Sequence, residues 1–433
     1  MPLRREVSLT SIQASNPNST SDSLMKIENL KVHFPIRRPL IQNLLSHEKL
    51  VVHAVDGVSL TVRPREILGI VGESGSGKTT LGRTVLRLLE PTSGRIELHG
   101  RDITHLGERE LRPLRRQMQI IFQDPHASLN PAMTIGRAIG HPLEIHDLVE
   151  NREEAHDRVL QVMREVGLTP EEQLYSKYPG DLSGGQRQRA AIARAMILRP
   201  ELIVADEPVA MLDMSIRAKV LELMMQLKQR HGLTYIFITH DLATAKLVCN
   251  RLAIMYLGRV VELGDAGEVY ADPKHPYTRA LLQAIPEPDP SKRKKKELPQ
   301  GEVPDAVHPP AGCRFHPRCP VALRTCGWEG QDFLDYIDRR SLDPVLEARD
   351  RLSVGREEDW EAKGLLASRK MVRGNQAGTV ESVTHVMSEA PMPMSQALSR
   401  VSVVGETVQV EFQPPADLQP KKIDDRVVEC LLY

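Results

Sequence analysis

A glycine-rich stretch from Gly72 to Thr79 has the residue types and spacing needed to hold phosphate groups. It reads Gly-Glu-Ser-Gly-Ser-Gly-Lys-Thr. Such glycines let the backbone turn tightly, so that several N–H groups point at one anion. Lys78 can reach the β- and γ-phosphates of a nucleotide, and the Thr79 hydroxyl can bind Mg²⁺. The candidate nucleotide contacts here are Gly72, Ser74, Gly75, Ser76, Gly77, Lys78, Thr79 and Thr80.

The elements around this stretch are those that a phosphate-binding loop requires. The apolar run 67–71 precedes it and predicts a short buried strand, and the run 80–89 follows with a helical pattern. A strand, a glycine-rich turn and a helix in this order separate a phosphate loop from an ordinary glycine-rich turn.

Two carboxylates follow a second apolar strand, predicted at 202–205. Asp206 would hold the Mg²⁺ shell, and Glu207 would polarise the water that attacks the γ-phosphate. Asp-Glu-Pro at a strand end can also be a plain turn, but beside a phosphate loop that is the lesser interpretation.

Two further polar residues end predicted strands. Gln123 follows an apolar run and could bind Mg²⁺ or the attacking water, since ligands of open α/β sheets gather at the carboxyl ends of strands. His240 follows the run 234–239, where its imidazole could contact the γ-phosphate. A glutamine or histidine at a strand end is by itself usually structural.

A second helix start able to receive phosphate is predicted at Ser183. Ser183 has the character of an N-cap, and the residues behind it, Gly184, Gly185 and Gln186, open an alanine-rich helix. Asp213 lies in a loop after the two carboxylates. Phe34 ends a predicted edge strand from Met25, where its ring could stack on adenine or simply belong to the core.

Composition excludes several classes of protein. The 433 residues contain 57 basic and 57 acidic side chains, so no overall basic field favours nucleic acid or anionic membranes. No apolar run reaches the roughly 18 residues of a spanning helix, and the first residues lack the apolar core of a secretory signal. We therefore expect a cytoplasmic chain.

Together these motifs resemble the ATP-binding cassette of ABC transporters, in the order and spacing of that family. The resemblance implies a P-loop NTPase of the α/β class, with a doubly wound core, an antiparallel β subdomain and an inserted helical subdomain. It also implies a cassette dimer, in which Ser183 and Gly185 serve the partner's nucleotide and Asp213 lines the seam between the two sites. Bound ATP and Mg²⁺, a second cassette subunit of a homologous but different chain, and no nucleic acid are expected.

The region after the cassette narrows the resemblance. His275-Pro276-Tyr277-Thr278 and the segment 309–320 are similar to the C-terminal region of oligopeptide and dipeptide importer ATPases. That similarity implies two transmembrane permease subunits, an extracytoplasmic substrate-binding protein and a place at the cytoplasmic face of the membrane. Nickel and some sugar importers share this region, so the substrate stays open.

Two other functions stay open on the sequence. One is a soluble ABC ATPase of nucleic-acid repair or ribosome function, although such relatives carry long insertions or two cassettes. The other is a subunit with a structural role whose partner hydrolyses ATP. The basic stretch 291–297 is interpreted as a solvated linker, with contact to anionic lipid as the alternative.

Four cysteines in the C-terminal part raise the question of a metal. Cys313, Cys319 and Cys326 are separated by five and six residues, and Cys430 lies near the end. Zinc sites generally use closer pairs, whereas an iron–sulfur cluster accepts looser spacing with one distant ligand. A [4Fe–4S] cluster is favoured over zinc or unligated thiols.

The predicted domain order follows from these observations. We expect a disordered arm at 1–24, the cassette at 25–270 with its helical subdomain at 131–182, a cysteine-containing region at 271–330, and an α+β extension at 331–433. Within the extension, 331–370 is predicted helical, 371–399 loop-like, and 400–404 and 407–412 strands. If Cys430 joins the other three cysteines, the extension must fold back on them.

Overall fold

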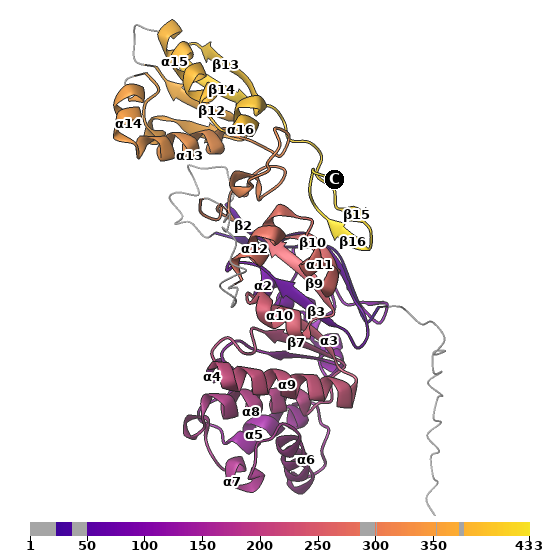
Figure 1. Ribbon diagram of the computed structural model, residues 1–433. Coiled ribbons are helices and arrows are strands. Elements are labelled where there is room, and N and C mark those ends of the chain that lie inside the picture. The colour runs from indigo at the N-terminus through magenta and orange to yellow at the C-terminus, as the bar shows by residue number, and fades with distance from the viewer. Residues whose placement is uncertain (1–22, 37–49, 286–298, 300, 352, 372–375) are drawn as a thin grey trace, which may run out of the picture.

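The structure is a computed structural model that describes all residues except 1–22, 37–49, 286–298, 300, 352 and 372–375. The predicted arm at 1–24 and the basic stretch 291–297 lie wholly or almost wholly outside the described residues. Figure 1 shows a row of three parts, with a helical lobe at one end, the sheets of the cassette in the middle and the C-terminal extension at the other end.

An eight-stranded sheet forms the centre of the molecule, and β6, β7, β8, β3 and β9 run parallel within it. Its order is β15 (Lys421–Ile423), β16 (Arg426–Val428), β10 (Arg259–Asp265), β9 (Arg251–Tyr256), β3 (Ile67–Val71), β8 (Thr234–Thr239), β7 (Leu202–Asp206) and β6 (Met118–Ile121). Residues of β7 alternate between two apolar clusters, with Ile203 in one and Val204 in the other. Both faces of the sheet are therefore covered, which explains why its strands are continuous apolar runs.

Helices connect and cover this sheet. They are α2 (Lys78–Val85), α3 (Glu108–Leu114), α9 (Met214–His231), α10 (Leu242–Val248), α11 (Ala266–Ala271) and α12 (Pro276–Ala284). The predicted strand–loop–helix order is present, because β3 leads into the glycine-rich loop and α2 follows it directly. The carboxyl ends of β3, β7 and β8 meet at one edge, where the candidate residues gather.

A four-stranded antiparallel sheet packs beside α2, in the order β2 (Val51–Val62), β1 (Met25–Pro35), β4 (Ser93–Leu98) and β5 (Arg101–Asp102). The prediction that the strand from Met25 is an edge strand was wrong, because β1 pairs with β2 on one side and β4 on the other. Its alternating pattern fits a central strand with one covered face, and Ile27 and Val32 are buried.

Helices occupy most of the region predicted as a helical subdomain at 131–182, and they begin before residue 131. The subdomain contains α4 (Pro125–Ser128), α5 (Ile135–Ile145), α6 (Arg152–Glu165), α7 (Glu171–Tyr175), a 3₁₀ turn at Pro179–Asp181 and the start of α8 (Gly184–Met196). Asn151 caps α6 by accepting a hydrogen bond from the Glu154 N–H at 2.9 Å. Val159 and Met163 face the core, as the helical spacing predicts.

The extension folds around its own apolar core and a third sheet. The sheet order is β11 (Glu361–Lys363), β12 (Leu366–Lys370), β14 (Thr407–Phe412) and β13 (Leu398–Val404), and the helices are α13 (Gly330–Ser341), α14 (Pro344–Asp350), α15 (Gln376–Ser388) and α16 (Met392–Ala397). The ring of Phe333 meets that of Trp360 edge-on at a centroid distance of 4.9 Å.

Two predictions for the extension were wrong. Strands β11 and β12 replace the predicted end of a helix, because pairing of β12 with β14 outweighs the local charged composition. Helices α15 and α16 replace the predicted loop, because Val383, Val386 and Met387 recur at helical spacing and are buried. The predicted strands at 400–404 and 407–412 are present as β13 and β14.

The last residues leave the extension and return to the cassette. Strand β16 pairs with β10 through Val427 and Val428, so the chain end completes the central sheet. Arg426 anchors this return: it is 4% exposed, and its guanidinium lies 3.5 Å from the Asp272 carboxylate and 3.9 Å from the buried Glu262 carboxylate. This short tail folds back, while α13 to α16 and the sheet of β11 to β14 form a separate lobe (Figure 1).

Candidate nucleotide site

The glycine-rich loop forms a tight cradle around the ammonium group of Lys78. Lys78 Nζ donates to the carbonyl oxygens of Gly72 at 2.9 Å and Glu73 at 2.7 Å, and to Ser76 Oγ at 3.3 Å. At Gly77 the backbone has φ of +96°, and an added Cβ would lie 2.0 Å from the Ala54 carbonyl oxygen. Only glycine fits there. Burial lowers the pKa of Lys78, while Glu207, Asp206 and Glu73 act in the opposite direction.

The first residue of α2 beyond the lysine faces the carboxylate at the end of β7. Thr79 Oγ1 donates to Asp206 Oδ1 at 2.9 Å. Asp206 is 1% exposed, and burial raises its pKa while the bond from Thr79 opposes this. A hydroxyl and a buried carboxylate side by side are oxygen ligands of the kind that Mg²⁺ takes, and a cation would compensate the cost of burying the carboxylate.

Glu207, Gln123 and His240 come from three strand ends and meet in one place. Glu207 accepts a hydrogen bond from Gln123 Nε2 at 3.1 Å and one from His240 Nδ1 at 2.9 Å. The backbone of Glu207 has a positive φ of 47°, a strained conformation for a side chain of this size. The carboxylate is thus aimed by two neighbours, next to the pair of Thr79 and Asp206.

The segment at the start of α8 has the predicted capping geometry. Ser183 Oγ accepts from the Gln186 N–H at 3.3 Å, and Gln186 Oε1 accepts from the Ser183 N–H at 2.9 Å. Ser183 and Gly184 are exposed. At Gly185, an added Cβ would lie 2.7 Å from Ile216 Cγ2 in α9, so a side chain would disturb the packing of the two helices.

Helix α8 and the helix α2 that follows the phosphate loop pack against different elements of the same chain. Helix α8 packs against α4, α5, α6 and α9, whereas α2 packs against β1, β2, β7 and β8. Asp213 caps α9 by accepting from the Ile216 N–H at 3.0 Å, and it lies between Met211 and Met214, which are 63% and 86% exposed. Large exposed apolar residues of this kind are typical of a surface that another protein covers.

Phe34 lies near the end of β1 and is 39% exposed. Its ring is therefore not a core residue, and it stays available for the predicted stacking on adenine.

A contact between the phosphate loop and the C-terminal region was not predicted from the sequence. The Glu73 N–H donates to the Tyr277 hydroxyl at 2.9 Å, and the Glu73 carboxylate accepts from Arg318 Nη1 at 3.0 Å and Nη2 at 3.4 Å. These partners are 204 and 245 residues away along the chain. Tyr277 lies in a segment singled out by family resemblance, but no spacing pattern links it to Glu73.

Cys313, Cys319, Cys326 and Cys430 gather at the base of the extension, and we call them the four-cysteine group. All but Cys319 are buried. Burial, with a smaller contribution from the other three thiols, raises the pKa of Cys313 to about 12. Cys326 and Cys430 each also raise the pKa of Cys319, and Cys430 raises that of Cys326. The distant fourth cysteine therefore lies close to the others.

A smaller group of ligand-type side chains lies on the antiparallel sheet. Among the residues that the structure describes, His33, His53 and Asp56 are the one trio of His, Cys, Asp or Glu whose ligand atoms all lie within 4.8 Å of one another. Asp56 already pairs with Arg314 and, at 3.4 Å, with Lys31. A divalent cation would meet these two positive charges, so we interpret the trio as part of an ion-pair cluster.

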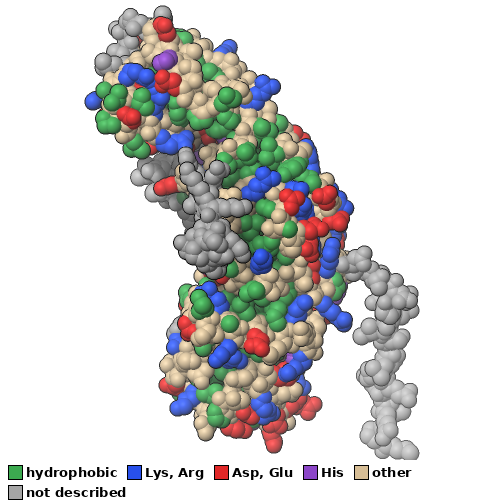
Figure 2. Space-filling view, in the orientation of Figure 1, with side chains coloured by type: hydrophobic (Ala, Val, Ile, Leu, Met, Phe, Trp, Pro, Cys, Tyr) green, Lys and Arg blue, Asp and Glu red, His purple; other side chains and the backbone are tan. Residues whose placement is uncertain are grey.

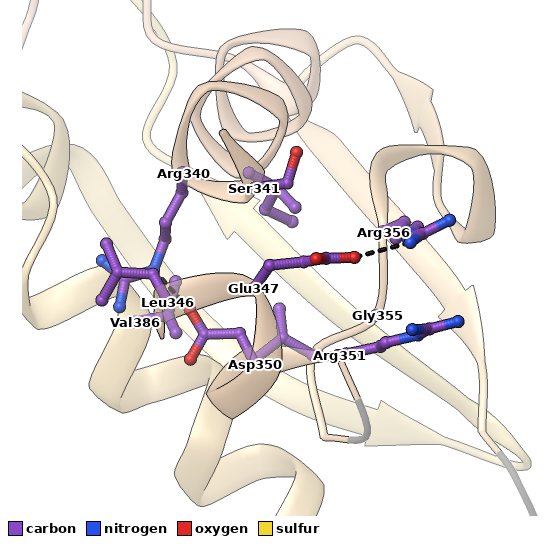
Figure 3. A pocket seen from close by; sticks show the side chains of 11 residues that line it. Arg340, Ser341, Leu346, Glu347, Asp350, Arg351, Gly355, Arg356 and Val386 are labelled. Carbon is purple, nitrogen blue, oxygen red and sulfur yellow. Dashed lines mark hydrogen bonds and ion pairs between the residues drawn. The ribbon is translucent and has the colours of Figure 1, made fainter. Parts of the chain in front are cut away.

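The pocket in the extension is filled by its own charge pairs. Figure 3 shows Glu347 directed at Arg356 across the pocket, while Arg340 contacts Asp350 in its wall. Glu347 and Asp350 are thus each paired with an arginine of the pocket. On the face shown in Figure 2, Lys and Arg side chains are scattered among acidic ones, in agreement with the balanced composition.

The fold and the site define an ATP-binding cassette ATPase, and comparisons with known proteins agree. The ABC transporter family model matches residues 55–210, and the model of the oligopeptide/dipeptide transporter C-terminal region matches residues 261–326. A probable peptide ABC transporter ATP-binding protein of Sinorhizobium fredii is 47% identical over 323 residues, which cover 74% of this chain and 89% of that protein.

The oligopeptide transport ATP-binding protein OppF of Salmonella typhimurium is 47% identical over 305 residues, covering 70% of this chain and 90% of that protein. A solved dimer of a bacterial ABC transporter cassette is 28% identical and covers 56% of this chain and 98% of that one, with a TM-score of 0.48. The chain belongs to the family of peptide ABC transporter ATP-binding proteins. Within the described part of the chain, no helix is both long and apolar enough to cross a bilayer.

Proposed function

We propose that this chain hydrolyses ATP to drive a membrane importer of oligopeptides or dipeptides. The observation that carries the proposal is the arrangement of Glu207, which Gln123 and His240 hold beside Thr79 and Asp206. A carboxylate fixed in this way can accept the proton of a water that attacks a γ-phosphate. The relatives' names support peptides as the cargo.

Each candidate residue of the chain would have a separate role in binding the nucleotide. Lys78 would exchange its contacts with loop carbonyls for the β- and γ-phosphates, and the backbone N–H groups of the loop would surround the anion. Thr79, Asp206 and Gln123 would hold Mg²⁺, which would neutralise charge on the phosphates. His240 would contact the γ-phosphate, and Phe34 would stack on the adenine.

The second half of each site would come from another cassette subunit. Ser183 to Gln186 open a helix whose exposed N-terminus can receive the partner's nucleotide, and Asp213 lies between exposed methionines that a partner would cover. We infer a dimer with a homologous, different chain, bound to two permease subunits at the cytoplasmic face of the membrane. A substrate-binding protein on the outer side would deliver the cargo.

Replacing Glu207 by glutamine tests the proposal. The variant keeps the shape of the side chain and removes the base, so hydrolysis by the assembled importer should fall at least about a hundredfold while ATP stays bound. ATP-dependent crosslinking of the two cassettes should persist longer than in the wild type. Glu201→Gln makes the same charge change just before the other end of β7, and it should leave turnover unaltered. Unchanged turnover in Glu207→Gln would refute the role of Glu207.

We further propose that the four-cysteine group holds a [4Fe–4S] cluster. Zinc at about 2.3 Å from each sulfur would bring the sulfurs within roughly 3.8 Å of one another, yet among the described residues no three of these thiols lie within 4.8 Å. The four ligand sulfurs of a [4Fe–4S] cluster lie further apart than those of a zinc site. Backbone N–H groups, such as that of Leu323 at 3.2 Å from Cys326 Sγ, would stabilise thiolates bound to it.

Metal analysis of protein purified without oxygen tests the cluster. We expect iron, acid-labile sulfide and broad visible absorbance, all lost in Cys313→Ser. Cys249→Ser is the matched control, because Cys249 lies at the end of α10 and outside the four-cysteine group. Zinc in place of iron, or no bound metal, would contradict the proposal.

A further inference from the structure

The loop between two cysteines reaches the phosphate loop through its arginines. We call residues 313–319 the cysteine loop. Arg318, just before Cys319, binds the Glu73 carboxylate with both terminal nitrogens of its guanidinium, at 3.0 and 3.4 Å. Its side chain is 11% exposed, and its Nη1 also donates to the Tyr256 hydroxyl at 3.3 Å. The pair is thus largely shielded from solvent and fixed on both sides.

Glu73 is held at three points, and one of them is the nucleotide lysine. Its carboxylate binds Arg318, its N–H donates to Tyr277, and its carbonyl oxygen accepts from Lys78 Nζ at 2.7 Å. The same carbonyl accepts from the Ser76 N–H at 3.2 Å, inside the turn. A displacement of Glu73 would therefore move both the turn and the ammonium group that must meet the phosphates.

A second arginine of the cysteine loop supports the other side of the same turn. Arg314, just after Cys313, donates to the Leu257 carbonyl oxygen, and the neighbouring Gly258 N–H donates to the Ser76 carbonyl oxygen at 3.0 Å. The rings of Tyr256, Tyr277 and Phe315 pack together between the two contacts, with centroids 4.6 to 5.3 Å apart. The cysteine loop thus contacts the phosphate loop directly through Arg318 and indirectly through Arg314, whose partner Leu257 precedes Gly258.

The negative charge of Glu73 explains why this contact matters for nucleotide binding. A carboxylate in a loop that must receive a triphosphate would repel its ligand unless a cation neutralised it. We propose that the cysteine loop positions the phosphate loop for ATP, and that Arg318 is the positioning residue, because it neutralises Glu73 and fixes its place in the turn. This inference rests on the proposed ATPase function, and it holds whichever metal the cysteines bind.

The test compares Arg318→Ala, Glu73→Gln and the double variant in the assembled importer. Arg318→Ala leaves the Glu73 charge free beside the anion site, so we expect the Kd for MgATP to rise about tenfold. Glu73→Gln removes that charge, so the double variant should regain most of the lost affinity. Arg324→Ala, an exposed arginine of the next cysteine segment, is the control and should bind ATP like the wild type.

The outcome separates this role from a merely structural one. If Arg318 only stabilised the fold, thermal stability would fall, ATP affinity would stay within about twofold of the wild type, and Glu73→Gln would rescue nothing. An ATP affinity of Arg318→Ala within about twofold of the wild type, or the absence of rescue by Glu73→Gln, would overturn the inference. Should Arg318→Ala fold poorly, Arg318→Lys keeps the charge without the paired contacts and should give an intermediate affinity. A wild type that binds no ATP would instead refute the proposed function.

Discussion

Replacing Arg426 by methionine should release the C-terminal hairpin of β15 and β16 from the central sheet. The guanidinium lies against Glu262, which is 0% exposed, and against Asp272. Removing one partner of a buried ion pair costs about 3 to 5 kcal/mol. We take the lower figure, because Glu262 keeps hydrogen bonds from the backbone N–H groups of Lys274 at 3.0 Å and His275 at 2.9 Å.

The effect should be local, because among the described residues the ladder between β10 and β16 has two residue pairs, Glu262 with Val428 and Leu263 with Val427, followed by one bond from the Glu429 N–H to the Val261 carbonyl oxygen at 3.0 Å. A loss of about 3 kcal/mol corresponds to roughly a hundredfold larger population of the detached hairpin. Amide hydrogen exchange in a peptide spanning 421–433 should accelerate by that factor, while β3 and β8 keep their protection. If the four-cysteine group holds the proposed cluster, the iron content should also fall, since Cys430 belongs to the same C-terminal segment as the hairpin.

Lys422→Met is the matched control for this experiment. Lys422 lies in the same hairpin and its side chain is 73% exposed, so its replacement should change exchange by less than about threefold. If Arg426→Met exchanged no faster than Lys422→Met, the buried ion pair would not be what holds the hairpin, and the reasoning would be wrong.

Two further predictions concern the cassette. In Gly82→Ala the new Cβ would lie 2.5 Å from Ile238 Cδ1. This overlap should lower the free energy of unfolding, measured by thermal denaturation, by about 1 to 3 kcal/mol. Adding Ile238→Val removes the overlapping methyl group and should restore part of the lost stability. Burial alone would raise the pKa of Asp56, but Arg314 and then Lys31 lower it to about 2, from an ordinary value of 3.8. Its stabilising contribution is therefore complete above about pH 4 and lost towards pH 2. This contribution amounts to at most about 2 kcal/mol, and to less where solvent screens the ion pair. In Asp56→Asn, the free energy of unfolding measured by denaturant titration should therefore depend less on pH in this acidic range.

The parts of the fold that the sequence predicted well are those set by neighbouring residues. The buried strand 67–71, the capped start of α8 at Ser183 and the carboxylate after β7 each depend on a few adjacent side chains. Local patterns carry such information, because strand burial and helix capping are decided within a few residues.

Most predictions that were wrong or missing concern contacts between segments that are distant along the chain. Whether β1 is an edge or a central strand depends on β4, and β12 is a strand because it pairs with β14. The bond between Glu73 and Arg318 joins residues 245 positions apart, and nothing near either residue specifies its partner. Helix α15 was missed for another reason: its apolar stripe is short and lies among polar residues.

The extension joins the cassette through two stems that touch each other. The Ala416 N–H donates to the Thr325 carbonyl oxygen at 3.0 Å, so the chain departs and comes back at nearly the same spot, next to Cys326. An extra lobe attached in this way interrupts neither sheet of the cassette. A binding partner that pulls on the lobe would therefore load these two stems, and the cysteines near them, before the strands of the cassette.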